Sequence, residues 1–599
     1  STSAQATLGG MAGHNSCGAR SIRYGNMVHN VLGIDAVLAD GTQAMFGPLF
    51  ANDAPPGAPR FQDLVARVRG IVRREKDEIA ARYPKLLRRV GGYNLDSLTE
   101  PAPNLAHLLV GSEGTLAYTR RIHLKLSPLP RERALGVCHF PTFRRAMEVT
   151  REIVTLKPTA VELVDRTMIE LARNSAGFAP IVRRFLKGEP DAILLVEFDG
   201  DDAEGPRAKL KDLAQLMADH GVPDAVVEAF DPAFQKDIWE VRKAGLNIMM
   251  SMKGDGKPVS FIEDCAVPLE HLADYTSALT EVFTKHGTKG TWYAHASVGC
   301  LHVRPVLNMK DPAGARAMRA IAEEAAALVR RYKGAYSGEH GDGLVRSEWI
   351  LPFFGPALTN AFAEIKDLFD PKGLMNPGKI VRPSKMDDRS LFRFKPGYAV
   401  AEPPTALDWS EWGGFGPAVE MCNNNGHCRK FDAGAMCPSF RATGDEAHLT
   451  RGRANTLRLA ISGQLGADAL ASDAVRESMA LCVACKGCKR ECPTGVDMAR
   501  MKIEFLHQYH RKVGYALRDK LIACLPRYAP AYRARYAPMA ALIAPLANLR
   551  NSVPALAALG ERFLGMTAKR PWPRWGGRFR APPTPQGDGR KGEVALFVD

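Results

Sequence analysis

Four cysteines between residues 482 and 492 have the spacing of a ligand set for an iron–sulfur cluster. The run Cys482-Val-Ala-Cys485-Lys-Gly-Cys488-Lys-Arg-Glu-Cys492-Pro493 follows the pattern C-x2-C-x2-C-x3-C-P. In that pattern the first three thiolates bind one cluster and the fourth binds a second cluster. A zinc site favours two separated pairs of ligands, and a disulfide framework suits a small secreted chain. The spacing therefore predicts at least one 4Fe-4S cluster and one-electron chemistry.

An incomplete partner motif precedes this run. Cys422, Cys428 and Cys437 are present, but Asn425 stands where a further cysteine is expected. If ligands cross over as in two-cluster ferredoxins, Cys437 completes the downstream cluster and Cys492 serves the upstream one. The upstream set is then one thiolate short. His427, Asn425 or a water are the alternatives for the fourth ligand, and a three-iron cluster is a further alternative.

Two histidines and a glutamate elsewhere in the chain could bind a different kind of metal. His295 and His302 are seven residues apart, and Glu339 and His340 follow in a glycine-bearing segment. Two histidines and one carboxylate with an open position make a divalent-metal site of the catalytic kind. Each histidine taken singly would be read as a structural side chain. The combination favours a metal site.

A glycine-rich segment, residues 6–25, lies near the start of the chain. Glycines let backbone N–H groups approach a phosphate or a planar ring closely. The segment lacks the G-x-G-x-x-G spacing of a dinucleotide-binding helix start, so a set of tight turns would explain the glycines equally well.

Resemblance to a known family favours the nucleotide interpretation. The segment looks like the flavin-contacting loop of the vanillyl-alcohol-oxidase superfamily, in its branch of FAD-linked D-2-hydroxy acid dehydrogenases. Motifs at 89–95, 109–116 and 370–379 follow in the family's order, so the resemblance covers residues 1–383. It implies that FAD is bound by Gly10, Asn15, Ser16, Gly18, Tyr24, Gly25, Gly111, Glu113, Gly114 and Asn376. The family's earlier pyrophosphate-binding loop is absent, which suggests a fragment of a longer protein.

The same resemblance implies roles for the polar cluster. His295, His302 and Glu339 match ligands of a divalent metal, zinc or manganese. Such an ion would hold the hydroxyl and carboxylate of a 2-hydroxy acid. His340 matches the general base, and a neutral imidazole near pH 7 suits removal of the hydroxyl proton.

Two cations match the family's carboxylate-binding positions. They are Arg242 and Lys257, and an arginine can bind a carboxylate through two parallel hydrogen bonds. Leu246 stands where the D-2-hydroxyglutarate enzymes have a hydroxyl residue. Arg304 is a further candidate for a carboxylate contact. The pattern leaves open which acid is the substrate.

The predicted fold class is α+β. Hydrophobic periodicity predicts strands and helices alternating from 135 to 230, among them strands at 135–140 and 192–198 and a helix at 143–155. Two split βαβ units favour a ferredoxin-like sheet. The expected domains are part of an FAD-binding domain at 1–130 with a helical insertion at 51–103, a FAD-linked oxidase substrate domain at 131–383, a linker at 384–417, a helical two-cluster ferredoxin-like domain at 418–500, a helical extension at 501–570, and a linker with the start of a truncated domain at 571–599. Within these, residues 58–90 have helical periodicity and residues 594–598 have the pattern of a strand.

Composition and charge limit the classes of molecule that the chain is expected to bind. The net charge is +15, but no basic block with interleaved aromatics predicts nucleic-acid binding. No stretch of 20 apolar residues predicts a membrane span, and no signal peptide is evident. Basic residues gather after Lys486, which fits a solvated face or a peripheral membrane contact equally well. We expect a cytoplasmic protein, in contact with the inner face of the cell membrane if that basic region binds it.

The motifs together predict a FAD-dependent dehydrogenase of a small anionic D-2-hydroxy acid. A flavin accepts two electrons and a cluster carries one, so the clusters would pass electrons singly to a quinone or a redox protein. The alternative is an electron-transfer or scaffold subunit whose flavin half is inactive. The residues leave the two open, although the intact His295, His302, Glu339 and His340 set favours the enzyme.

Overall fold

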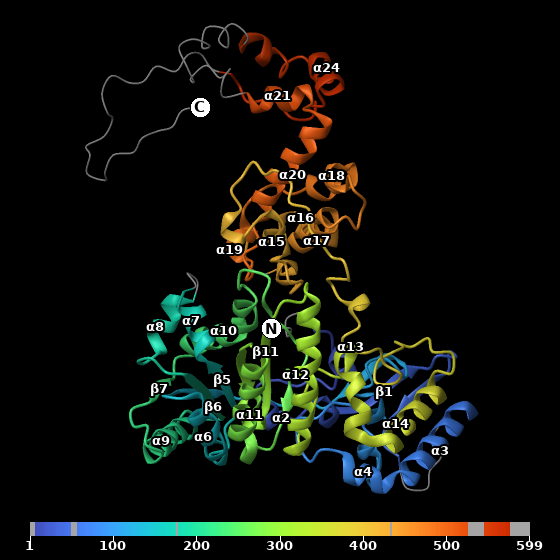
Figure 1. Cartoon of the computed structure of the whole chain (residues 1–599). Helices are drawn as coiled ribbons and strands as arrows, with labels where there is room; N and C mark the ends of the chain where they lie inside the picture. The colour runs from blue at the N-terminus through green and yellow to red at the C-terminus, as the bar shows by residue number, and fades with distance from the viewer. Residues whose placement is uncertain (1–5, 50–56, 175–177, 432–433, 525–543, 576–599) are drawn as a thin grey trace.

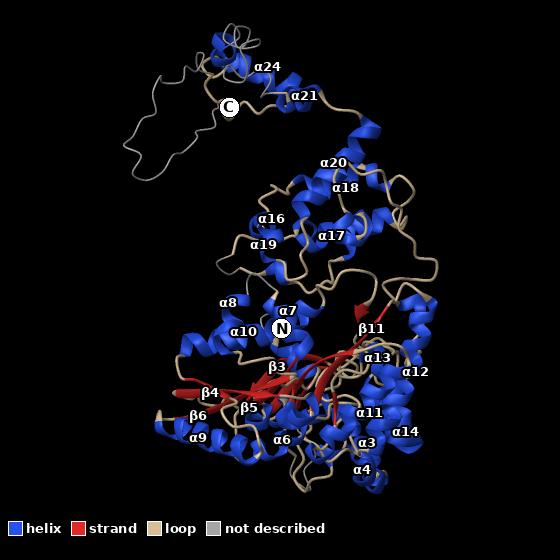
Figure 2. Cartoon of the chain, turned by 60° about the vertical axis from the view of Figure 1, so that its left-hand side comes forward, coloured by secondary structure: helices blue, strands red, loops and turns tan. Residues whose placement is uncertain are grey.

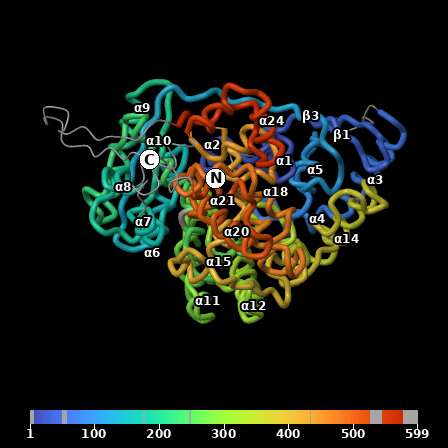
Figure 3. The backbone as a smooth tube through the Cα atoms, turned by 90° about the horizontal axis from the view of Figure 1, so that it is seen from above, coloured from blue at the N-terminus to red at the C-terminus, as the bar shows by residue number. Residues whose placement is uncertain are grey.

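The computed structural model of the chain describes residues 6–49, 57–174, 178–431, 434–524 and 544–575. Two sheets with their helices form a broad base, and a cysteine-rich helical part stands above it (Figure 1). Seen from above, the helices of this part lie over the middle of the base (Figure 3). No helix in the described ranges is long and apolar enough to cross a membrane.

The N-terminal sheet has the order β2 (Gln43–Phe46), β1 (Val31–Val37), β3 (Tyr118–Leu124), with antiparallel pairs. Helix α3 (Pro59–Arg74) packs on it, and so does α14 (Ile350–Phe369) from much later in the chain. The rings of Phe46 and Phe369 stack with centroids 6.1 Å apart. The segment that carries Asn376 directly follows α14 and therefore starts beside the N-terminal sheet.

Helical periodicity over 58–90 is only partly correct. Helices α3 and α4 (Lys76–Arg82) confirm most of it, but residues 83–90 form no helix. Tyr83 has φ −68° and ψ 126° because the ring of Pro84 disfavours helical geometry at the residue before it. Residues 83–95 instead run as turns toward the loop at 337–343, where Val90 donates its N–H to the carbonyl of Ser337.

The large sheet has the order β7-β4-β6-β5-β10-β11-β8, with β9 paired to β11. Its first four strands are β7 (Val226–Ala229), β4 (Glu132–Phe140), β6 (Ala192–Gly200) and β5 (Ala160–Asp165). Helices α6 (Phe143–Thr155) and α9 (Glu204–Asp219) connect them. This is the ferredoxin-like order of a split βαβ pair, as predicted. The sheet continues through β10 (Gly290–His295), β11 (Cys300–Leu307), β8 (Lys257–Pro258) and β9 (Cys265–Ala266).

Alternating side chains give this sheet two buried faces. In β6, Leu194 and Val196 pack with α6, α9, α11 (Leu272–Lys285) and α12 (Pro312–Arg331). Ile193 and Leu195 pack with α7 (Arg166–Arg173), α8 (Ala179–Phe185) and α10 (Pro232–Met249). Figure 2 shows α6 and α9 below the sheet and α7, α8 and α10 above it. A polar side chain on the upper face of these strands therefore lies between the sheet and helices α7, α8 and α10.

The cysteine-rich part is helical, as predicted. Its helices are α15 (Phe415–Glu420), α16 (Pro438–Thr443), α17 (Thr450–Ile461), α18 (Asp473–Ala480), α19 (Gly487–Glu491) and α20 (Met498–Val513). The expected linker is anchored, because buried Glu504 accepts a hydrogen bond from Trp409 Nε1 at 3.1 Å. Helices α21 (Leu517–Ala523) and α24 (Pro554–Leu564) follow. A strand expected near residue 594 lies outside the described residues.

Candidate active site and cluster-binding sites

Strand register brings the two histidines together. Tyr293 on β10 lies opposite His302 on β11, and His295 lies opposite Glu162 on β5. Opposite residues of an antiparallel pair point to the same face. Trp292 and Ala294 fill the core below the sheet, so His295 points to the other face, beside α10. The rings of Tyr293 and His302 stack with centroids 4.7 Å apart.

The loop at 337–343 brings a carboxylate to these histidines. The Nε2 atoms of His302 and His295 lie 3.0 and 3.4 Å from Oε1 of Glu339. The Nε2 atom of His340 lies 3.2 Å from the same oxygen. Asp264 fixes the loop by accepting the backbone N–H groups of Glu339 and His340 at 3.1 and 2.5 Å. The four predicted residues therefore form one cluster.

This donor set fits a divalent metal ion. One ligand atom each from His295, His302 and Glu339 lies within 4.8 Å of the others. Nδ1 of His295 is 2.6 Å from Oε1 of buried Glu162, which leaves Nε2 as the free ligand atom. A carboxylate on the far nitrogen of a metal-binding histidine is a common supporting contact. The residues present fit the ion that the sequence predicted, and its binding remains a proposal.

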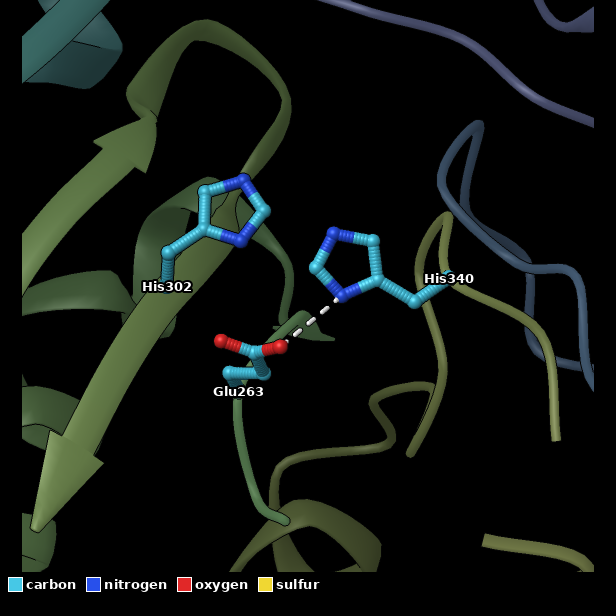
Figure 4. A group of neighbouring side chains, drawn as sticks. All are labelled: Glu263, His302 and His340. Carbon is cyan, nitrogen blue, oxygen red and sulfur yellow. Dashed lines mark ion pairs between the residues drawn. The ribbon is translucent and has the colours of Figure 1, made fainter. Parts of the chain in front are cut away.

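Glu263, His302 and His340 form a second group of possible ligands. Figure 4 shows the two imidazole rings facing each other with Glu263 beneath them. Their centroids are 5.1 Å apart, and Oε1 of Glu263 lies 3.3 Å from Nδ1 of His340. Arg304 forms an ion pair with the other oxygen of Glu263, so that charge is already balanced. Glu263 is thus placed to orient His340, whose Nε2 then faces Glu339.

Burial and charge act in opposite directions on this cluster. Burial lowers the pKa of His302 to about 4. Burial disfavours the charged form of Glu339, but His295 and Arg88 hold the pKa of that carboxyl well below its usual range. Burial also opposes charge on His340, yet Asp264 and Glu263 raise its pKa to about 10. The expected neutral imidazole is therefore not favoured by the protein groups alone.

Buried charged side chains contact the histidine cluster, and the sequence did not reveal them. Glu162 joins His295 to Arg242, whose guanidinium lies 2.6 Å from Oε2 of Glu162. Arg88 is fully buried and donates to Oε2 of Glu339 at 2.6 Å. Its other terminal nitrogen donates to the carbonyl of Gly18 at 2.8 Å. These partners come from distant segments, and no local motif marks them.

The two predicted carboxylate-binding cations are placed differently. Arg242 is 8% exposed, joins the cluster through Glu162, and stacks 4.6 Å from the centroid of Tyr293. Lys257 instead donates to the carbonyl of Met252 and lies 3.5 Å from Sδ of Met421 in the cysteine-rich part. The side chain of Leu246 lies outside the described residues.

The predicted flavin-binding residues lie on three separate segments. The first segment has Gly10 in α1 (Leu8–Gly13), Asn15, Ser16 and Gly18 in the loop that follows, and Tyr24 and Gly25 at the end of α2 (Ser21–Tyr24). The second segment, between α5 (Ala106–Leu109) and β3, has Gly111, Glu113 and Gly114. The third segment has Asn376, which follows α14. Hydrogen bonds join these segments, from Gly111 N–H to the Ala12 carbonyl at 2.9 Å and from Asn376 Nδ2 to the Glu113 carbonyl at 2.7 Å.

The structure ties this assembly directly to the histidine cluster. The carboxylate of Glu113 accepts the backbone N–H groups of Asp342 and Gly343 at 2.5 and 3.0 Å. Gly341 has φ +79°, and a Cβ there would lie 2.5 Å from Glu113 Oε1, so this close approach requires glycine. Open space faces the backbone at Gly13, Gly18 and Gly114. Bare backbone beside the cluster fits a planar cofactor.

A cavity of about 960 Å³ borders the 337–343 loop at Ser337 and Asp342. It is lined by the 81–91 segment and by Ser337, Asp342 and Tyr336. His295, His302, Glu339 and His340 do not line it. The cavity also lacks a set of metal-binding or proton-transferring groups comparable to the histidine cluster.

The downstream cysteines form one site. Cys437, Cys482, Cys485 and Cys488 line a single small cavity, so Cys437 lies with the three downstream cysteines; that the four bind one cluster stays a prediction. Fully buried Arg453 lies 3.6 Å from Sγ of Cys437. Burial opposes ionisation of this thiol, but Ser439 and Arg453 hold the pKa of Cys437 below its usual value. Four thiols around one cavity fit a 4Fe-4S cluster.

The upstream site has three thiols. Cys422 and Cys428 are buried, and both interact electrostatically with Cys492. Oδ1 of Asn424, rather than Asn425, is the amide oxygen near Cys422, 3.8 Å from its sulfur. Asn425 bonds instead to Asn423. The fourth ligand of this site therefore remains a prediction.

Comparison with known families agrees with these sites. Residues 1–47 match the family described as FAD binding domain, residues 129–380 match FAD linked oxidases, C-terminal domain, and residues 418–496 match 4Fe-4S dicluster domain. The chain therefore carries FAD-linked oxidase domains followed by a 4Fe-4S dicluster domain. The predicted fold class and family resemblance are confirmed.

Several curated proteins are similar over much of the chain. The D-2-hydroxyglutarate dehydrogenase of Escherichia coli (strain K12) is 32% identical over 94% of this chain and 59% of its own length. That of Pantoea ananatis (strain AJ13355) is 33% identical over 88% of this chain and 56% of its own length. The D-lactate dehydrogenase of Archaeoglobus fulgidus is 28% identical over 63% of this chain and 70% of its own length. The chain thus spans less than two thirds of the first two relatives.

Proposed function

We propose that this chain is the substrate-oxidising part of a FAD-dependent D-2-hydroxy acid dehydrogenase. One observation carries the proposal. Three imidazole Nε2 atoms converge on Oε1 of Glu339, within a loop that Glu113 joins to the predicted flavin segments. An inactive scaffold would have no need for these buried charges, each of which costs free energy to bury.

The residues divide the chemistry among them. His295, His302 and Glu339 would hold a divalent ion that polarises the substrate hydroxyl and binds its carboxylate. That ion would also offset the charge of Glu339, which favours a neutral His340. His340 is the most exposed of the four, with 33% of its side chain accessible, and its Nε2 is the atom that would accept the hydroxyl proton. Bound FAD would accept the hydride and the clusters would carry electrons singly.

Arg242 is the residue we propose for a substrate carboxylate. Its guanidinium is held over Tyr293 and beside Glu162, so its position is fixed before substrate arrives. Arg304 is already used by Glu263, Tyr293 and Ser260. The names of the similar proteins make D-2-hydroxyglutarate the first acid to test and D-lactate the second. Lys257 stays a predicted carboxylate contact with no support from its present neighbours.

The electron acceptor and location remain proposals of the same kind. A quinone or a redox protein would accept electrons from the cluster sites. We propose a cytoplasmic location, in contact with the inner face of the cell membrane where the acceptor is a quinone.

Anaerobic flavin bleaching in the full-length protein tests the function. We expect D-2-hydroxyglutarate or D-lactate to bleach the flavin absorbance and the L-enantiomers to leave it unchanged. His340→Asn should slow bleaching by a hundredfold to ten-thousandfold, the usual range for a general base. His286→Asn, outside the cluster on a surface ion pair with Glu324, is the matched control. Bleaching by no 2-hydroxy acid, or at an unchanged rate in His340→Asn, would refute the proposal.

A further inference from the structure

The cysteine-rich part touches the oxidase part through the residues that lead into Cys422. Nζ of Lys257 lies 3.5 Å from Sδ of Met421, and Nζ of Lys310 lies 2.5 Å from Oε2 of Glu420. Arg393 donates a hydrogen bond of 2.8 Å to the carbonyl of Cys422 itself. Figure 1 shows α15, which ends at Glu420, at the lower end of the helical part above β11 and α12.

Two of these contacts come from segments next to strand β11, which carries His302: Lys257 lies on the neighbouring strand β8, and Lys310 lies in the turn between β11 and α12. Lys257 begins β8, which pairs with β11 through Lys257 opposite Leu307. His302 lies on the same strand β11. One strand of the large sheet therefore extends from the proposed substrate site to the contact beside Cys422.

The two thiol sites differ in their exposure. Cys422 and Cys428 are 6% and 7% exposed, and the contact reaches the backbone of Cys422. At the downstream site Cys437 and Cys488 are as buried, at 8% and 7%, but Cys485 is exposed and its neighbour Val483 is 69% exposed. Lys486 and Lys489 are also exposed there. The upstream site is thus enclosed toward the oxidase part, and the downstream site opens to solvent.

We propose that the site of Cys422, Cys428 and Cys492 receives electrons from the oxidase part first, and that the site of Cys437, Cys482, Cys485 and Cys488 passes them outward. Each oxidation of a 2-hydroxy acid releases two electrons and two protons. The electrons leave one at a time through the upstream site to the downstream site, and a one-electron oxidant at the exposed face is reduced twice. This order rests on the proposed function.

Cysteine variants of the full-length protein test the order. The reduced flavin would be formed anaerobically with the acid that bleaches it, and cluster signals would be followed by freeze-quench electron paramagnetic resonance. In Cys428→Ser we expect dithionite to reduce the downstream cluster, but substrate to reduce it at least a hundredfold more slowly than in the wild type. In Cys485→Ser we expect substrate to reduce the upstream cluster at the wild-type rate. Cys524→Ser, outside both motifs, is the control.

The opposite pattern would overturn the proposal. In that pattern substrate reduces the downstream cluster rapidly in Cys428→Ser, or fails to reduce the upstream cluster in Cys485→Ser. Iron counts identify which cluster each variant has lost. If substrate leaves the flavin oxidised in the wild type, the proposed function fails instead.

A second variant needs no cysteine change. Lys257→Met removes a positive charge beside Met421, so the cluster next to it should become harder to reduce. In a dithionite titration without substrate, we expect the midpoint potential to fall for the signal that Cys428→Ser removes. A shift confined to the other signal would contradict the assignment. Lys253→Met, on the same loop but paired with Glu411, is the control.

Discussion

Glu162 offers the sharpest test of how this cluster is held. Its carboxylate is 1% exposed, lies 2.6 Å from Nδ1 of His295 in a hydrogen bond, and forms an ion pair of 2.6 Å with Arg242. In Glu162→Gln the amide oxygen can accept from one of these groups, while the amide nitrogen faces the other donor. Arg242 becomes a buried cation without a counter-charge in both orientations of the amide, and in one of them His295 also loses its orienting partner.

The expected loss of metal affinity follows from the kind of contact removed. Changing the partner behind a metal-binding histidine typically weakens binding tenfold to a hundredfold. That range corresponds to about 1.4 to 2.8 kcal/mol. Because Arg242 would hold the substrate carboxylate, we also expect KM for the acid to rise.

The assay is equilibrium dialysis of the full-length protein against buffered zinc or manganese, with bound metal counted separately from iron. Glu170→Gln, an exposed side chain on α7 paired with Arg166, is the matched control. If Glu162→Gln binds metal within threefold of the wild type while its thermal unfolding is normal, Glu162 does not orient the site and the reasoning is refuted.

Three further outcomes are expected. Cys482→Ser should lose about four irons per chain and the part of the brown colour that belongs to the downstream cluster, whereas unchanged iron or zinc in its place would contradict the cluster assignment. Arg88→Met should destabilise the fold by about 3–5 kcal/mol, because it leaves Glu339 buried without its partner, and Arg88→Lys should recover part of this in chemical denaturation; equal stability of Arg88→Met and the wild type would contradict it. Burial raises the pKa of Asp165 to about 6 from 3.8, so its contribution is complete below pH 3.8 and is lost as pH rises through 6, about 3 kcal/mol in all. The unfolding temperature of Asp165→Asn, measured relative to that of the wild type, should therefore increase from pH 5 to pH 7.5. A difference in unfolding temperature that stays constant over this range would contradict the prediction.

Local sequence patterns were sufficient for most of the secondary structure. The helix expected at 143–155 is α6, and the strands expected at 135–140 and 192–198 lie within β4 and β6. Their alternation also predicted the ferredoxin-like order of the four strands. The helical period failed after Arg82, where a proline overrides the composition of the segment.

The site divides along the same line. The sequence by itself determined the cluster spacing, the pair His295 and His302, and the neighbouring Glu339 and His340, because each is fixed by short-range spacing within one motif. Only the tertiary structure decided that Glu162 lies opposite His295, that Arg88 reaches Glu339, and that Lys257 lies against Met421. Strand register and domain packing join residues distant in sequence, and a buried charge is stable only where such a partner meets it. No local pattern records which partner that will be.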